Sequence, residues 1–294
     1  MGERLFGVFP AVITPFDEVG RTDAAAFVRL LAWHESVGCD GVVVSGTNGE
    51  AASMTVRERM DLFTLATTHR GKLRIIAGTG SANLEDTNLL NKHAAAEGCD
   101  AALVMPPYYF KNPPQAGVRE YYRRVLDAAR LPLLLYNIPQ ITDTPIHIET
   151  LAALADHPNL LGMKDSSGSP DYFRAALETL PGKCVMVGQE NLLLECLRLG
   201  GSGTVSGASN AYPELAVGVV RAFQSGGDVE SAQERLTAMN EVLREYGLPA
   251  AGKAVVRARG LPGGRMRLPL MDLTEEQTLE MMARFERLGL PKTA

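Results

Sequence analysis

Eight short apolar runs alternate with helix-like segments along most of the chain, and this alternation constrains the fold more than any other feature. The expected strands lie at residues 8–13, 41–45, 73–77, 100–105, 132–137, 160–164, 184–187 and 202–206. The runs are apolar throughout rather than on alternate residues, which is typical of parallel strands buried on both faces. Eight strands close a barrel, whereas a doubly wound sheet usually needs fewer. The sequence therefore predicts an α/β fold, a (β/α)8 TIM barrel.

Helical periodicity fills the intervals between the runs and continues alone after residue 224. Helices are expected near 23–37, 55–70, 83–97, 114–130, 146–156, 169–180, 190–199 and 212–224, and then at 228–246, 250–259 and 274–288. Thr55 and Glu58 have the spacing of a capping box at a helix start. Because no Pro-, Gly- or Ser-rich linker divides the chain, we expect residues 1–224 to form a catalytic barrel and residues 225–294 a C-terminal helical extension of the same domain.

The composition excludes several classes of protein. The 294 residues include 29 Lys and Arg against 34 Asp and Glu, a formal net charge of −5 without blocks of like charge, so we expect no nucleic-acid partner. No apolar run approaches the roughly 20 residues that span a bilayer, and residues 1–10 lack the layout of a signal peptide, so we expect no membrane partner. The cysteines form no CxxC pair and the histidines no HExxH motif, so we expect no bound metal. The resulting hypothesis is a cytoplasmic enzyme with buried, reduced cysteines.

In a barrel of this kind, functional side chains lie at the C-terminal ends of the strands. Lys164 closes the apolar run that begins at Leu160, so we expect its ammonium group near the mouth of the barrel. Desolvation lowers the pKa of a lysine and prepares the amine to attack a carbonyl carbon. The alternative is a lysine that merely extends from a strand end into solvent.

Two further features lie at the same predicted rim. Tyr136 ends the neighbouring strand, so its phenol is a candidate for proton transfer, although a core tyrosine has the same pattern. The loop Gly-Thr-Asn-Gly-Glu at 46–50 offers backbone N–H groups, a hydroxyl and an amide, which suit a small carboxylate. The alternative for this loop is a plain turn.

Several motifs, in order along the chain, resemble those of the dihydrodipicolinate synthase / N-acetylneuraminate lyase family of pyruvate-dependent class I aldolases. They are GTNGE at 46–50, PPYY at 106–109, YNIP at 136–139, GMKDSSG at 162–168 and RLPL at 267–270. The resemblance covers nearly the whole chain. It implies a lyase with a TIM barrel and a C-terminal helical extension, assembled as a homotetramer built from two dimers.

The resemblance also implies roles for the residues at the rim. Lys164 matches the Schiff-base lysine, Tyr136 the proton-relay tyrosine and Thr47 the relay hydroxyl, while Asn48 occupies the carboxylate-binding position. Lys164 would condense with the C2 carbonyl of pyruvate or a longer 2-oxo acid, without another cofactor. The iminium would act as an electron sink while Tyr136 and Thr47 move protons.

The resemblance assigns a further backbone contact and a contact between subunits. Val205 matches a strand residue whose main-chain carbonyl faces the active site. Tyr109, or else Tyr108, matches a tyrosine lent across a dimer interface, and an extra residue between PPYY and YNIP leaves that choice open.

Two departures from the family pattern bear on the substrate. Asn48 stands where many members have threonine, and this form of the loop, like HPNLLGMKDS at 157–166, resembles the 4-hydroxy-2-oxoglutarate aldolase branch. Ile141 stands where the synthases have an arginine that holds the carboxylate of aspartate semialdehyde. The leading hypothesis is therefore an aldolase of 4-hydroxy-2-oxoglutarate or a 2-keto-3-deoxy sugar acid, with Ile141 in the substrate-binding site. The alternative within the family is 4-hydroxy-tetrahydrodipicolinate synthase.

Two hypotheses outside this class remain open. Gly200, Gly201, Gly203 and Gly207 could form a phosphate cup, in which case Lys164 and its neighbours would have no role. The second hypothesis is a non-catalytic sensor that binds 2-oxo acids. The set of Lys164, Tyr136 and Thr47 argues against it, because binding alone needs no proton relay.

Overall fold

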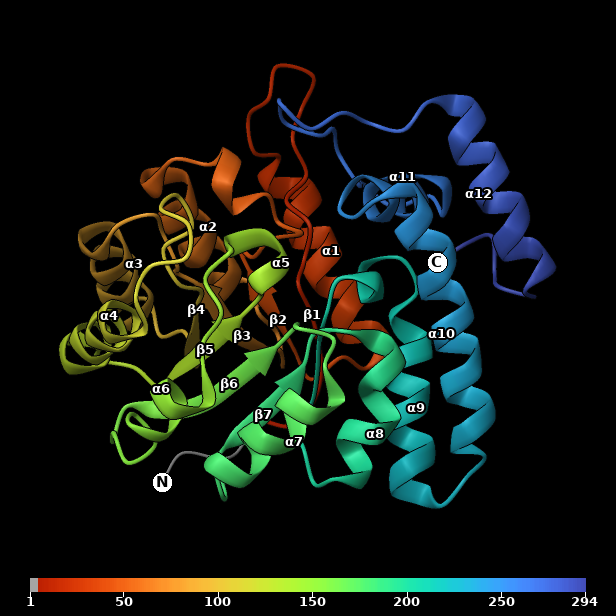
Figure 1. Cartoon of the computed structure of the whole chain (residues 1–294). Coiled ribbons are helices and arrows are strands. Elements are labelled where there is room, and N and C mark those ends of the chain that lie inside the picture. The colour runs from red at the N-terminus through yellow and green to blue at the C-terminus, as the bar shows by residue number, and fades with distance from the viewer. Residues whose placement is uncertain (1–4) are drawn as a thin grey trace.

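The computed structural model describes residues 5–294 and contains an eight-stranded parallel barrel surrounded by helices (Figure 1). The strands are β1 (Gly7–Pro10), β2 (Gly41–Val44), β3 (Arg74–Gly78), β4 (Ala101–Val104), β5 (Leu133–Asn137), β6 (Leu160–Asp165), β7 (Cys184–Val187) and β8 (Gly203–Ser206). They pair in the order β1-β8-β7-β6-β5-β4-β3-β2. Just beyond β1, Ala11 forms a parallel bridge with Val43, and the Val12 N–H donates to the Val43 carbonyl at 3.0 Å. These contacts close the seam between β1 and β2, and the predicted barrel is confirmed.

The helices largely follow the predicted order. They are α1 (Ala24–Val37), η1 (Ala51–Ser53), α2 (Val56–Thr68), α3 (Leu84–Ala96), α4 (Gln115–Ala128), α5 (Pro139–Thr142), α6 (Ile148–Ala152), α7 (Pro170–Thr179), η2 (Glu190–Leu192), α8 (Leu193–Arg198), η3 (Ala208–Asn210), α9 (Pro213–Ser225), α10 (Val229–Tyr246), α11 (Ala250–Ala258) and α12 (Glu275–Arg287). The capping box before α2 is confirmed, because the Thr55 hydroxyl accepts from the Glu58 N–H at 3.2 Å and Glu58 accepts from the Thr55 N–H at 2.8 Å.

The sequence missed several local features, among them two that follow strands β5 and β7. The helix expected at 190–199 is divided into the 3-10 turn η2 and the short helix α8. The short helix α5 was not expected, because one turn is too short to show helical periodicity. Both features lie directly after strands of the barrel, so they shape the loops of its C-terminal rim.

The strands are apolar throughout because both of their faces are buried. On β2, Val43 points into the barrel, whereas Val42 and Val44 point outward to the surrounding helices. The side chains that fill the barrel include Phe9, Val43, Ile76, Leu103, Leu134, Met186 and Val205. The four cysteines are also buried, as predicted.

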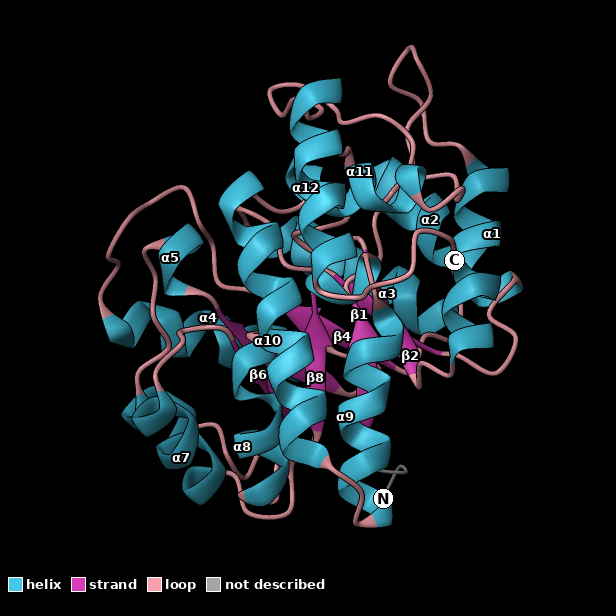
Figure 2. Cartoon of the chain, turned by 90° about the vertical axis from the view of Figure 1, so that its right-hand side faces the viewer, coloured by secondary structure: helices cyan, strands magenta, loops and turns pink. Residues whose placement is uncertain are grey.

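The C-terminal extension returns to the end of the barrel where catalysis is expected. Helix α10 packs along α9 and contacts η2 and η3, which follow β7 and β8 (Figure 2). Helices α11 and α12 then pack against α10 and against each other. The last turns of α10 therefore lie beside the rim of the barrel. Within residues 5–294, no helix has the length and apolarity needed to cross a membrane.

Candidate active site at the C-terminal end of the barrel

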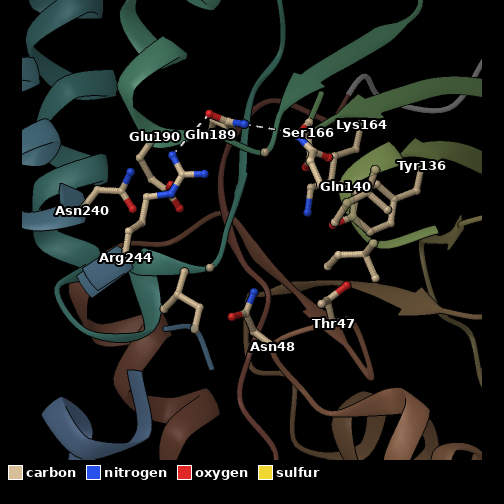
Figure 3. A pocket seen from close by; sticks show the side chains of 15 residues that line it. Thr47, Asn48, Tyr136, Gln140, Lys164, Ser166, Gln189, Glu190, Asn240 and Arg244 are labelled. Atoms are coloured by element: carbon tan, nitrogen blue, oxygen red, sulfur yellow. Dashed lines mark hydrogen bonds between the residues drawn. The ribbon is translucent and has the colours of Figure 1, made fainter. Parts of the chain in front are cut away.

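A cavity of about 280 Å³ opens at the C-terminal ends of the strands (Figure 3). It combines side chains of the barrel loops with side chains of α10. The lining residues are Thr47, Asn48, Tyr136, Ile138, Gln140, Ile141, Lys164, Ser166, Gly188, Gln189, Glu190, Gly207, Asn240, Arg244 and Leu248. The structure thus brings together five residues that the sequence assigned to a site: Thr47, Asn48, Tyr136, Ile141 and Lys164.

Lys164 and Tyr136 face each other at one end of this cavity. They are directly paired in the parallel register of β5 and β6, so the strands themselves set their spacing. The Lys164 Nζ lies 4.2 Å from the centroid of the Tyr136 ring, and the two residues are only 4% and 5% exposed. The amine is thus held in a confined pocket over the aromatic face of the residue that carries the phenol.

Asp165, the next residue on β6, is hydrogen-bonded to other residues of the barrel. The Asp165 carboxylate accepts a hydrogen bond from Asn137 Nδ2 at 2.8 Å and from the Ser167 hydroxyl at 2.8 Å. Burial raises the pKa of Asp165, and these hydrogen bonds act against that increase. Asp165 is therefore part of the support of β5 and β6, whereas Lys164 is presented to the cavity.

The β2–α2 loop holds Thr47 and Asn48 at the same end. Glycine at position 207 makes room for Asn48, because a Cβ there would lie 2.6 Å from Asn48 Nδ2. The backbone of the loop is fixed at Gly49, whose carbonyl accepts from the Thr14 hydroxyl at 2.8 Å. A hydroxyl and an amide thus reach the cavity from a loop whose backbone is anchored.

Glu50, which ends this loop, connects it to the C-terminal extension. Its carboxylate is paired with Lys253 of α11 at 2.5 Å, and both side chains are fully buried. It also accepts from the Arg267 N–H at 2.9 Å. Burial lowers the pKa of Lys253, and the Glu50 charge acts against that shift. Sequence reasoning assigned no role to this pair, because its two members lie far apart in the chain.

Arg59 supports the loops from below. Its guanidinium donates to the carbonyls of Gly78 and Gly80 at 2.6 and 3.0 Å, and to the Ser45 hydroxyl at 3.0 Å. Burial lowers the pKa of Arg59 to about 10. The loops after β2 and β3 are therefore tied to one buried cation behind the cavity.

Three other sequence candidates lie outside the cavity lining. Tyr109 is 74% exposed and packs edge-on against Phe110, with ring centroids 5.3 Å apart. Tyr108 lies in the same segment after β4, and neither tyrosine lines the cavity of the single chain. The side chain of Val205 is fully buried inside the barrel below the cavity.

Sequence reasoning assigned no role to six further polar residues of the cavity lining. Gln140, Ser166, Gln189 and Glu190 follow strands β5, β6 and β7, so their position at the rim could have indicated them. Asn240 and Arg244 come from α10, one helical turn apart. No strand-end rule applies to a helix of the extension, so the sequence carried no signal for these two residues. Within residues 5–294, no three His, Cys, Asp or Glu side chains are grouped so that they could hold a metal ion.

The comparisons with known proteins agree with the fold. The dihydrodipicolinate synthetase family matches residues 4–288. A DapA-like lyase of Chloroflexus aurantiacus is 38% identical, and the aligned residues cover 96% of each of the two chains. The 4-hydroxy-tetrahydrodipicolinate synthase of Methanosarcina acetivorans is 33% identical over 97% of this chain and 99% of its own. The structure of YagE, a prophage protein of the dihydrodipicolinic acid synthase family from E. coli K12 in complex with pyruvate, superimposes with a TM-score of 0.92 at 27% identity, covering 97% of this chain and 99% of that one.

The barrel and the polar cavity at its C-terminal rim define an enzyme, and the relatives place it among the pyruvate-dependent lyases of the class I aldolase type. The chain belongs to the dihydrodipicolinate synthetase family.

Proposed function

We propose that the protein is a Schiff-base-forming class I aldolase that acts on pyruvate or a longer 2-oxo acid, of the 4-hydroxy-2-oxoglutarate or 2-keto-3-deoxy sugar acid type. The observation that carries this proposal is the pairing of Lys164 with Tyr136, with Nζ 4.2 Å from the ring, inside a cavity that Thr47 also lines. A buried amine beside a proton donor is what iminium formation and breakdown require.

In the proposed mechanism, the neutral amine of Lys164 attacks the C2 carbonyl of the substrate and water leaves, which gives an iminium. A base removes the proton of the C4 hydroxyl, and the bond between C3 and C4 breaks. Its electrons flow into the iminium to give an enamine, and the aldehyde is released. Tyr136 and Thr47 relay these protons, and protonation of C3 followed by hydrolysis frees pyruvate. The covalent link through Lys164 replaces any other cofactor.

The substrate carboxylate next to C2 is assigned to Asn48 and the backbone of its loop. Short side chains and glycines allow an anion to approach N–H groups at this position. The Val205 carbonyl is assigned to the floor of the site. Tyr109, or else Tyr108, is assigned to a neighbouring subunit's site in a homotetramer, and the exposure of the Tyr109–Phe110 pair fits such a contact. We also propose a cytoplasmic location for this enzyme.

The second candidate is 4-hydroxy-tetrahydrodipicolinate synthase, the activity named for several relatives, including the one from Methanosarcina acetivorans. Against it, position 141 has an isoleucine that is 52% exposed at the rim. An apolar side chain cannot make the bidentate contact with a carboxylate that arginine makes. The aldolase proposal therefore takes precedence.

Borohydride reduction in the presence of pyruvate tests the proposal. We expect a mass gain confined to a peptide that contains Lys164, and no gain without pyruvate. A panel of 4-hydroxy-2-oxo acids, assayed for pyruvate release, then identifies the substrate. A coupled reductase assay with pyruvate and aspartate semialdehyde tests the second candidate. Absence of any pyruvate adduct would contradict the Schiff-base mechanism.

A further inference from the structure

The end of the cavity opposite Lys164 is polar, and its side chains come from helix α10 of the C-terminal extension. Figure 3 shows Arg244 and Asn240 together on the far side of the cavity from Lys164 and Tyr136. Gln189 lies between the two groups and contacts both Arg244 and Ser166. Arg244 and Asn240 are one turn apart on α10, so the same face of this helix presents both. A substrate attached to Lys164 would extend from one group toward the other.

Arg244 has a guanidinium group available for a ligand. Its Nη1 makes one long contact of 3.5 Å with Gln189 Oε1. Across residues 5–294, no carboxylate forms an ion pair with it, whereas Arg284 nearby is paired with Glu245 at 2.5 Å. A guanidinium group presents several donors in a planar fork that matches a carboxylate. Arg244 therefore lines the cavity with a charge that forms no ion pair with a side chain of residues 5–294.

Asn240 is the polar neighbour of Arg244 on the same face of α10. The residue is only 3% exposed and lines the cavity, yet its side-chain oxygen has no hydrogen-bond partner within residues 5–294. The donors of its side chain are the two N–H groups of Nδ2, and these are the groups that a carboxylate can accept from.

The acidic group that shares this end is already engaged. Glu190 Oε1 accepts from the Ser206 hydroxyl at 2.6 Å and from the Ala208 N–H at 3.0 Å. Its carboxylate is thus held toward the end of β8 and does not form an ion pair with Arg244. The positive charge of Arg244 therefore remains available to a ligand.

We propose that Arg244, with Asn240 beside it, binds the distal carboxylate of the substrate, so that the enzyme selects dicarboxylic 2-oxo acids. This inference rests on the proposed Schiff-base function, because Lys164 fixes the other end of the substrate. It deepens that function by naming a substrate class. It also provides an anion-binding residue from the extension in place of the apolar Ile141.

The experiment compares two 2-oxo acids of equal chain length without requiring cleavage. 2-Oxoglutarate ends in a carboxylate and 2-oxopentanoate in a methyl group, and borohydride traps either one on Lys164. The readout is the concentration of 2-oxopentanoate that gives half-maximal modification, divided by that of 2-oxoglutarate. A substitution that weakens trapping of both acids equally leaves this ratio unchanged. Pyruvate trapping is measured in parallel. The variants are Arg244→Ala, Arg244→Lys and, as a matched control, Arg235→Ala, an exposed arginine of α10 that does not line the cavity.

We expect the unmodified enzyme to prefer 2-oxoglutarate, and Arg244→Ala to reduce that preference by about 10- to 150-fold, as for a lost charged hydrogen bond. Arg244→Lys should keep part of the preference, and Arg235→Ala all of it. If the unmodified enzyme does not prefer 2-oxoglutarate to 2-oxopentanoate, or if Arg244→Ala leaves the ratio of the two concentrations unchanged, this inference is wrong. The proposed Schiff-base function is not affected by either result. Absence of a pyruvate adduct in the unmodified enzyme contradicts the proposed function, and this inference with it.

Discussion

The two ends of the cavity differ in the parts of the chain that carry their side chains. At one end, Lys164 and Tyr136 are buried and stand on paired strands of the barrel. At the other end, Arg244 and Asn240 come from one helix of the extension. Strand register fixes the first pair, whereas tertiary packing places the second.

In the proposed mechanism, this difference separates the residues that react from those that select the substrate. Groups that exchange protons must stay within hydrogen-bond reach of each other, so rigid strands suit them. Groups that recognise the distal part of a substrate can change with the loops and helices at the rim, without disturbing the reacting end. The largest effects of substitution are therefore expected at the strand-borne end.

Replacing Lys164 with alanine tests the strand-borne end most directly. We expect kcat to fall by several orders of magnitude and covalent trapping to disappear, because the covalent route is lost. The measurements are pyruvate release and borohydride trapping. Lys92→Ala, which removes an exposed lysine of α3, is the matched control. Normal turnover by the Lys164 variant would show that the strand-borne end of the cavity does not carry the covalent chemistry.

Tyr136→Phe sharpens the comparison within the strand-borne end. Loss of one positioned acid–base group lowers kcat by about 10²- to 10⁴-fold. The variant should still bind pyruvate, because Thr47 and Asn48 are retained. Steady-state kinetics together with the trapping assay separate these two effects. An unchanged kcat would show that Tyr136 is only a packing residue.

The buried pair of Glu50 and Lys253 tests the connection between the barrel loop and the extension. Lys253→Met leaves the carboxylate of Glu50 buried without its partner, and removing one member of a buried pair costs about 3–5 kcal/mol. We expect the free energy of unfolding in denaturant to fall by this amount.

Arg284→Ala provides the contrast for this third prediction. It breaks a more exposed pair with Glu245, and exposed pairs contribute about 0–1 kcal/mol. Equal losses of stability in the two variants would mean that the buried pair does not hold the loop to the extension.

The smallest effect on activity is expected at the rim. Ile141→Arg adds a cation near the distal part of the substrate, so use of aspartate semialdehyde should improve, by about 10- to 150-fold in kcat/KM, and use of the native substrate should decrease. The coupled reductase assay is run on both proteins. If the unmodified chain is already as active in this assay as an authentic synthase, the argument from Ile141 fails. The synthase activity then becomes the leading candidate.

The sequence predicted the strand-borne end because its signals are local. A lysine at the end of an apolar run, and a tyrosine at the end of the preceding one, must lie at the same rim once the strands are parallel. The family motifs add roles to these positions. By contrast, Asn240 and Arg244 lie on a long amphipathic helix, in which nothing local distinguishes a side chain that lines a cavity from one in solvent.

The sequence by itself therefore determined the barrel and the order of its elements, and it predicted the end of the cavity that is proposed to react, because backbone periodicity and strand ends depend on neighbouring residues. Only the tertiary structure decided which face of α10 meets the rim, and which buried charges join Glu50 to Lys253. These contacts depend on how elements distant in the chain pack together, since the same apolar stripe can pack against several partners. The distal end of the cavity, and with it the proposed choice of substrate, is a product of that packing.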